Sequence, residues 1–111
     1  MSIASERHGD ILVLRPLGML DQGKAAELDQ RASAAVAAGI CRVVFDLSAL
    51  EHLSAEGLRV MLSIHKQLAA NNGIVTIVTP PAEAGQLLDW TGMSALISAS
   101  PTLEEALAHA A

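Results

Sequence analysis

The sequence has very few aromatic residues: Phe45 and Trp90 are the only two, and tyrosine is absent. A chain this poor in aromatic rings offers no stacking platform for the bases of a single-stranded nucleic acid. Basic residues are also few, seven against twelve acidic ones, which gives a formal net charge of −5. Because the basic residues are scattered, the sequence argues against binding to nucleic acid or to an anionic membrane surface.

Cysteine occurs once, at Cys41, so no internal disulfide can form, and no cysteine–histidine spacing matches a zinc site. Because Cys41 stands at the entrance to an apolar segment, we expect a small buried thiol with a packing role. The chain has no apolar run of about 18 residues and no basic-then-apolar amino terminus. We therefore expect a soluble, cytoplasmic protein.

Apolar residues, in contrast, make up 51% of the 111 positions. Enough apolar surface can be buried to offset the entropy lost on ordering, which predicts one compact domain over residues 1–111. A weak strand over 2–8 and a better strand over 11–17 flank a turn at His8-Gly9-Asp10 and predict a hairpin. Pro16 cannot donate to a ladder, so it belongs at a strand end or an edge.

Strands and helices alternate after this hairpin. Asp21 predicts the N-cap of a helix over 22–38 that ends at Gly39. Apolar strands are expected over 42–47 and 74–79. Between these strands a helix is expected over 55–71. The helical spacing predicts two buried stripes, Ala25, Leu28, Ala32, Ala35 and Val36 on the first helix and Leu58, Met61, Leu62, Leu68 and Ala69 on the second.

The last third of the chain continues the alternation. Thr79-Pro80-Pro81 predicts the start of a helix running to Trp90 and closed by Gly92. A short strand is expected near 95–98, and the capping box Thr102–Glu105 opens a final helix. The sequence therefore predicts an α/β fold, a mixed sheet of about four to five strands with about four helices.

The most informative stretch runs from Val43 to Leu58. It predicts a buried strand that ends at Asp46, a short crossing, and a helix with Ser54 as N-cap and Glu56 in its first turn. Unpaired N–H groups and the positive end of the helix dipole converge there, which suits an anion and a phosphate most of all. We expect Asp46, beneath the crossing, to accept hydrogen bonds from loop N–H groups.

Five local patterns in this order resemble a STAS domain, the family of the anti-sigma factor antagonists. They are Gly18-Met19-Leu20-Asp21, Asp46-Leu47-Ser48, Gly57-Leu58, Trp90-Thr91-Gly92-Met93 and Thr102-Leu103-Glu104-Glu105-Ala106. The resemblance implies a STAS-like fold and a role in partner switching. An unmodified domain docks onto an anti-sigma serine kinase of the histidine-kinase-like ATPase type, and phosphorylation of a loop serine breaks the complex. The domain itself catalyses nothing.

The family's Asp-Ser-Ser before Gly-Leu is Ser54-Ala55-Glu56 in this chain, so the acceptor position carries no hydroxyl. Three interpretations of Glu56 stay open: a helix-terminal acid that interacts with the dipole, a built-in mimic of the phosphorylated state, or a catalytic carboxylate. Ser54 is interpreted first as the helix cap and second as an alternative phosphosite. Gly57 allows another backbone to approach closely.

The expected partner-binding surface combines the 18–21 edge with the 53–57 loop and the start of the second helix. Its residues are Met19, Leu20, Asp21, Leu53, Ser54, Ala55, Glu56, Gly57 and Leu58. Two alternatives remain, a STAS accessory subunit of a lipid-transport ABC complex and an anion- or nucleotide-binding module. We expect no enzyme, cofactor or metal, because no nucleophile–base pair or carboxylate pair is evident. His65 is expected at the core or its boundary.

Overall fold

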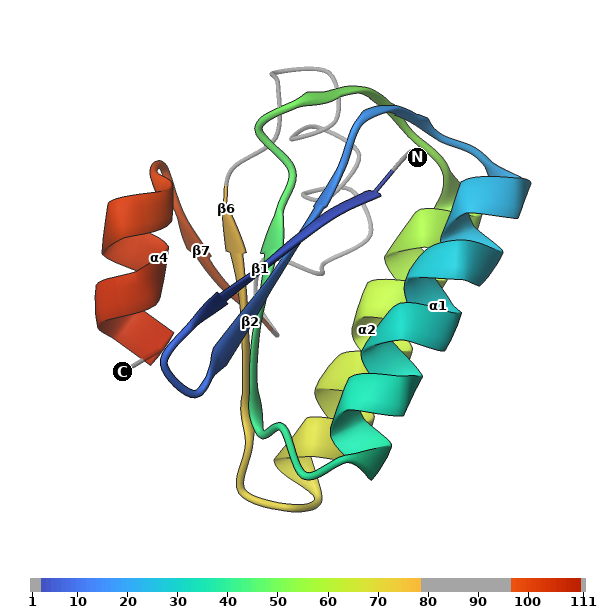
Figure 1. Cartoon of the computed structure of the whole chain (residues 1–111). Helices are drawn as coiled ribbons and strands as arrows, with labels where there is room; N and C mark the ends of the chain where they lie inside the picture. Colours follow the sequence, from blue (N-terminus) through green and yellow to red (C-terminus); the bar gives the residue numbers. More distant parts are fainter. Residues whose placement is uncertain (1–2, 79–96, 111) are drawn as a thin grey trace.

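The computed structural model describes residues 3–78 and 97–110 of the chain, with the side chains of His52 and Leu53 excepted. Its main feature is a five-stranded sheet in the order β1-β2-β4-β6-β7 (Figure 1). The strands are β1 (Ile3–His8), β2 (Ile11–Pro16), β4 (Arg42–Asp46), β6 (Ile74–Val78) and β7 (Ser98–Ser100). The β1–β2 hairpin is antiparallel and every other pairing is parallel, so the predicted mixed sheet and opening hairpin are confirmed.

Helices cover both faces of this sheet. Helices α1 (Gln22–Ala37) and α2 (Ala55–Ala69) pack side by side on one face, and α4 (Leu103–Ala110) lies on the other (Figure 1). Within the described part of the chain there are three helices. The helix expected from residue 79 to Trp90, its end at Gly92 and the Trp90–Met93 pattern lie outside the described residues. The predicted α/β layer fold is confirmed.

A second, smaller sheet was not predicted from the sequence. Strands β3 (Gly18–Leu20) and β5 (Leu50–Leu53) pair with each other in parallel, with Met19 opposite His52 and Leu20 opposite Leu53. This ribbon carries the chain from β2 into α1 and from β4 into α2. Gly18 begins it with φ +71, a conformation that glycine adopts without steric cost.

The core has two parts, one under each helical layer. Phe45 of β4 is fully buried beneath α1 and α2, together with Leu28 and Met61. The smaller part beneath α4 joins sheet residues to two alanines of that helix, and its members are Ile11, Val13, Val44, Val78, Ala106 and Ala110. Short side chains on α4 let this helix lie close to the sheet.

The predicted helical stripes are largely correct, with one error. Ala25, Leu28 and Ala32 are buried, and Ala35 and Val36 pack partly buried against the same core. On α2, Leu58, Met61 and Leu68 are buried and Leu62 is half-buried. Ala69 is exposed, and Ile64 takes the core position instead, because the buried stripe advances by three residues from Met61 and then by four to Leu68. His65 is half-buried at the core boundary.

The predicted helix boundaries depend on caps that the structure contains. Asp21 Oδ1 accepts a hydrogen bond from Lys24 N at 3.0 Å, which makes Asp21 the N-cap of α1. Gly39, at φ +98, lies just past the end of that helix, and Ile40 N donates to Ala35 O at 3.0 Å. At the last helix Glu105 N donates to Thr102 Oγ1 at 3.2 Å. The strand expected near 95–98 is found at Ser98–Ser100.

Helix α2 ends at a close contact with the start of β4. Asn72 adopts φ +61, and Gly73 N donates to Leu68 O. A Cβ on Gly73 would lie 2.6 Å from Cys41 O and 2.9 Å from Leu68 Cβ. Glycine is therefore required at this position by backbone proximity, since a real Cβ does not come this near to a carbonyl oxygen.

Candidate functional site

The parallel strands β2, β4 and β6 all end at the same end of the sheet, which also carries the β3–β5 ribbon. We call residues 17–21 and 48–57 the ribbon edge. Two backbone hydrogen bonds join its segments, Gly18 N to Ala49 O at 3.1 Å and Ser54 N to Leu20 O at 3.3 Å, and Leu50 N donates to Leu47 O at 3.1 Å in the turn before β5. The edge therefore consists of two chain segments that fix each other.

A buried carboxylate lies beneath the ribbon edge. Asp46, 2% exposed, accepts hydrogen bonds at Oδ1 from Ser48 N (3.0 Å) and Ser48 Oγ (2.6 Å). Its Oδ2 accepts from Arg15 Nε at 2.9 Å. The prediction that Asp46 binds loop N–H groups is confirmed, whereas Arg15 was missed because 31 residues separate the two side chains in the sequence.

These partners keep Asp46 ionised although it is buried. Burial by itself raises the pKa of Asp46, but the hydrogen bonds from Ser48 and Arg15, with the charge of Arg15, outweigh it and leave the pKa lowered. The pKa of Arg15 is raised, chiefly by its hydrogen bond to Asp46. Arg15 also reaches Glu6 Oε1 at 3.4 Å, an exposed and weaker contact on β1.

The start of α2 has the predicted cap. Ser54 Oγ accepts a hydrogen bond from Gly57 N at 3.2 Å, and the dihedral angles of Ser54 are extended. Glu56 is exposed in the first helical turn, where its charge interacts favourably with the helix dipole. Because the Ser54 oxygen already satisfies one first-turn N–H, less of this helix end is available to an external anion.

The structure divides the predicted surface residues into two groups. Met19 is 52% exposed, and Asp21, Ala55 and Glu56 are also exposed. Leu20, Gly57 and Leu58 are buried and support the edge from inside. Ser54 is half-buried, and Leu53 is placed by its pairing with Leu20 in the ribbon.

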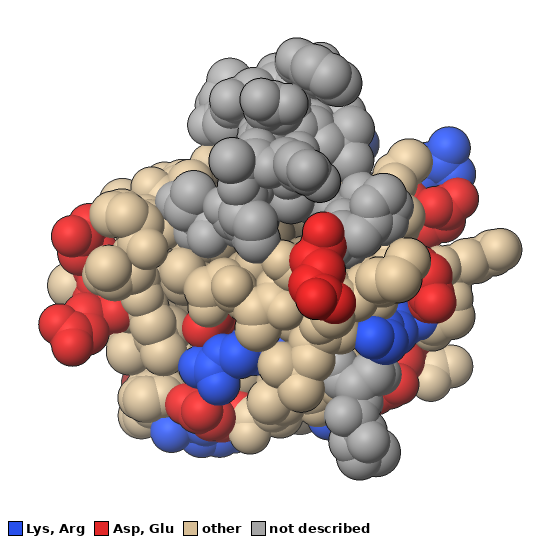
Figure 2. Space-filling model, turned by 90° about the horizontal axis from the view of Figure 1, so that it is seen from above, with Lys and Arg blue, Asp and Glu red and all other residues tan. Residues whose placement is uncertain are grey.

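One exposed apolar residue beside Met19 was not predicted. Leu17 is 39% exposed, and its carbonyl oxygen accepts a hydrogen bond from Lys24 Nζ at 2.7 Å. Seen from above, this end of the molecule carries scattered acidic and basic side chains on a surface that is otherwise uncharged (Figure 2). Residues two apart on a strand face the same side, so a strand over 17–19 would have Leu17 on the same side as Met19. This spacing is the signal in the sequence that could have indicated the exposure of Leu17.

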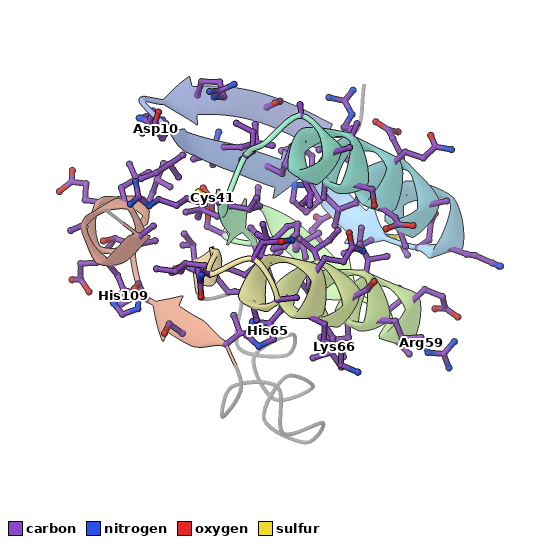
Figure 3. All side chains as sticks on the ribbon, turned by 90° about the horizontal axis from the view of Figure 1, so that it is seen from below. Asp10, Cys41, Arg59, His65, Lys66 and His109 are labelled. Carbon is purple, nitrogen blue, oxygen red and sulfur yellow. The ribbon has the colours of Figure 1, made fainter. Side chains whose placement is uncertain are left out.

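The opposite end of the molecule contains a cavity of about 330 Å³. It is lined by Val36, Gly39, Ile40, Cys41, Leu68 and Asn71. Cys41 is exposed, so the expectation of a buried thiol was wrong (Figure 3). The residue precedes β4, where the chain still belongs to the connection from α1 and has not entered the sheet.

Among residues 3–78 and 97–110, no three His, Cys, Asp or Glu side chains come together as a possible metal site. None of the helices α1, α2 and α4 is long and apolar enough to cross a membrane.

The two sheets and the helices on both faces define a mixed α/β domain, and comparison with known proteins identifies its family. The model of the STAS domain matches residues 2–106, so the chain belongs to the STAS domain family. The chain is 26% identical over 108 residues to BtrV of Bordetella bronchiseptica, a protein named as a proposed anti-sigma factor antagonist. That match covers 97% of this chain and 93% of BtrV.

Solved structures agree with this result. An anti-sigma factor antagonist from Mycobacterium paratuberculosis is 28% identical, with a TM-score of 0.83 and coverage of 97% and 92% of the two chains. The fold is also shared with a proposed anti-sigma factor antagonist from Thermotoga maritima, at a TM-score of 0.91, 19% identity and coverage of 97% and 93%. This STAS domain therefore has anti-sigma factor antagonists among its homologues.

Proposed function

We propose that this chain is a non-enzymatic regulatory protein that binds an anti-sigma factor through the ribbon edge. The partner in this proposal is a serine kinase of the histidine-kinase-like ATPase type. The observation that carries the proposal is the position of Glu56, exposed in the first turn of α2 where the family's pattern has an acceptor serine. Homology to anti-sigma factor antagonists supports the class of partner.

In this proposal Glu56 replaces a removable charge by a permanent one. A phosphoserine carries about −1.5 to −2 charges and three strong acceptor oxygens, whereas a glutamate carries one charge and two oxygens. A kinase cannot phosphorylate this position, because no hydroxyl is present. The chain would therefore act constitutively, and its partner would always meet a carboxylate at this point.

The exposed members of the ribbon edge are the proposed contact surface. Met19 and Ala55 would supply apolar contact surface, and the carboxylates of Asp21 and Glu56 would lie at its rim, an arrangement typical of an apolar centre with a polar rim. Leu20, Gly57 and Leu58 are buried and would act by holding that surface in place. In this proposal residues 1–111 act as one domain in the cytoplasm.

Two features of the helix start count against an anion-binding module. Ser54 Oγ already accepts from Gly57 N, so this donor is occupied within the chain. The carboxylate of Glu56 stands in the same turn and would repel a phosphate. A protein partner that meets one exposed carboxylate is the better explanation of both features.

The proposal is tested with Glu56→Ser and Glu56→Ala against the purified anti-sigma factor kinases of the host genome. We expect the wild type to bind one of them and the affinity to change in both variants. With ATP, the wild type should gain no phosphate in its intact mass, whereas Glu56→Ser should gain one. Glu104→Ala is a matched control, since Glu104 is also an exposed acid in a first helical turn. Equal affinity of the wild type and both Glu56 variants would remove any role for the carboxylate.

A further inference from the structure

We propose that Arg15 is a positioning residue for the ribbon edge, which it controls through Asp46 and Ser48. The inference rests on the proposed function of that edge and adds a residue that contacts no part of it directly. Arg15 lies on β2, the strand next to β4 in the main sheet. Since Leu14 pairs with Phe45, the following residues of the two strands, Arg15 and Asp46, are neighbours.

The two oxygens of the Asp46 carboxylate have different hydrogen-bond partners. One oxygen, Oδ2, accepts from Arg15 Nε at 2.9 Å, and the other, Oδ1, accepts from both Ser48 N and Ser48 Oγ. The side chain of Asp46 is 3% exposed, while that of Arg15 is 26% exposed. The guanidinium therefore closes the solvent-facing side of a buried carboxylate and fixes the rotation of its other oxygen toward Ser48.

The chain after Ser48 connects this residue to the exposed surface. Ala49, the next residue, accepts a hydrogen bond from Gly18 N at 3.1 Å, and Gly18 directly precedes the exposed Met19. Leu47 directly precedes Ser48 and is fully buried, so it fixes the other end of the Ser48–Ala49 turn. A displacement of Ser48 and Ala49 must therefore be taken up by β3, because Leu47 cannot follow.

Removal of the guanidinium would disturb this arrangement. Asp46 Oδ2 would lose its partner in a site where an unpaired charge is unfavourable, so the carboxylate would turn toward the water admitted in place of Arg15. Oδ1 would then leave Ser48, and the start of the crossing would lose both of its side-chain hydrogen bonds. The expected defect lies at the ribbon edge, although the deleted charge lies on a different strand.

The experiment compares Arg15→Met with Arg42→Met. Arg42 stands at the other end of the sheet, at the start of β4, and reaches Asp10 only at 4.0 Å, so it is a matched control. Both variants and the wild type are measured by ¹H–¹⁵N spectroscopy and amide hydrogen exchange at a temperature where all three are folded. For Arg15→Met we expect faster exchange at Ser48 and shifted amide signals at Ser48, Gly18 and Met19. Arg42→Met should leave these signals unchanged.

Affinity for the anti-sigma factor that binds the wild type is the second measurement. Arg15→Met should weaken it by about tenfold, because about 1.4 kcal/mol of the binding free energy would then be needed to re-order the ribbon edge. Because Arg15 acts through Ser48, Arg15→Met combined with Ser48→Ala should weaken binding no more than the more damaging single change. Additive losses, wild-type affinity of the folded Arg15→Met variant, or unchanged Ser48 and Gly18 signals would each overturn the assignment.

The two proposals can fail separately. If no anti-sigma factor binds the wild type, the proposed function fails, and the amide signals alone decide whether Arg15 positions the ribbon edge. If the wild type binds and Arg15→Met binds equally well, the proposed function stands and the role of Arg15 is disproved.

Discussion

Replacing Asp46 by Asn tests how much stability the buried carboxylate contributes. The amide oxygen of the variant can still accept from Ser48 N and Ser48 Oγ, so two of the three hydrogen bonds persist. The charge-assisted bond to Arg15 is lost, which costs about 1.5–3 kcal/mol of unfolding free energy. Asp46→Ala removes all three hydrogen bonds and should cost about 3–5 kcal/mol, as for other broken buried pairs.

Urea unfolding at pH 7, followed by circular dichroism, measures both losses. With a slope of about 1–3 kcal/mol per molar urea, Asp46→Asn should lower the midpoint by roughly 1 M. Asp10→Asn is the control, because Asp10 is 86% exposed and its contact with Arg42 is 4.0 Å long. An unchanged midpoint for Asp46→Asn would show that the carboxylate contributes no net stability.

The stability difference between the wild type and Asp46→Asn should also depend on pH. The pKa of Asp46 is lower in the folded chain than in the unfolded chain, where it is about 3.9. Its ionised form therefore stabilises the fold above that pH, and this contribution is lost as the pH falls through the folded value. The stability difference between the wild type and Asp46→Asn should shrink below about pH 4. A difference that stays constant or grows between pH 7 and pH 3 would refute the assignment of the lowered pKa.

Three further outcomes follow from the packing and the caps. Gly73→Ala should lose about 1–3 kcal/mol of stability in urea unfolding, because its Cβ would meet Cys41 O at 2.6 Å and the side chain of Leu68; a neutral result contradicts the close contact. Ser54→Ala should lower the free energy of unfolding by about 1 kcal/mol, since Gly57 N loses its acceptor. Ser54→Asp should keep most of this stability, because aspartate also caps a helix. The Cys41 thiol should react stoichiometrically with a disulfide reagent in native buffer, and a reaction that requires urea contradicts its exposure.

The larger elements were predictable because their signals are local. The helix at Gln22–Ala37 has a cap at Asp21, a buried stripe and a terminating Gly39, and each of these is visible within the segment itself. The helix at Ala55–Ala69 was placed for the same reason, although its end was set two residues too far. Apolar runs with β-branched residues on both faces were sufficient to place β4 and β6.

The ribbon and the Arg15–Asp46 pair were not predictable in this way. Strands of three and four residues are too short to show a period, so β3 and β5 appear only when their pairing is seen. The ion pair depends on which strands are neighbours and in which register, information that neither residue carries. The error at Cys41 has a related cause, because a general preference of thiols for burial says nothing about where a connection leaves the molecule.

The ribbon of β3 and β5 shares no ladder with the main sheet, and Met19 on it is exposed. Leu20 and Leu50, which are both buried in the core, tie the ribbon to the interior. A duplicated copy of this gene could therefore acquire a different binding surface through changes at a few outward positions, while the rest of the fold stays the same. The same property makes the ribbon a convenient segment to exchange between domains of this fold.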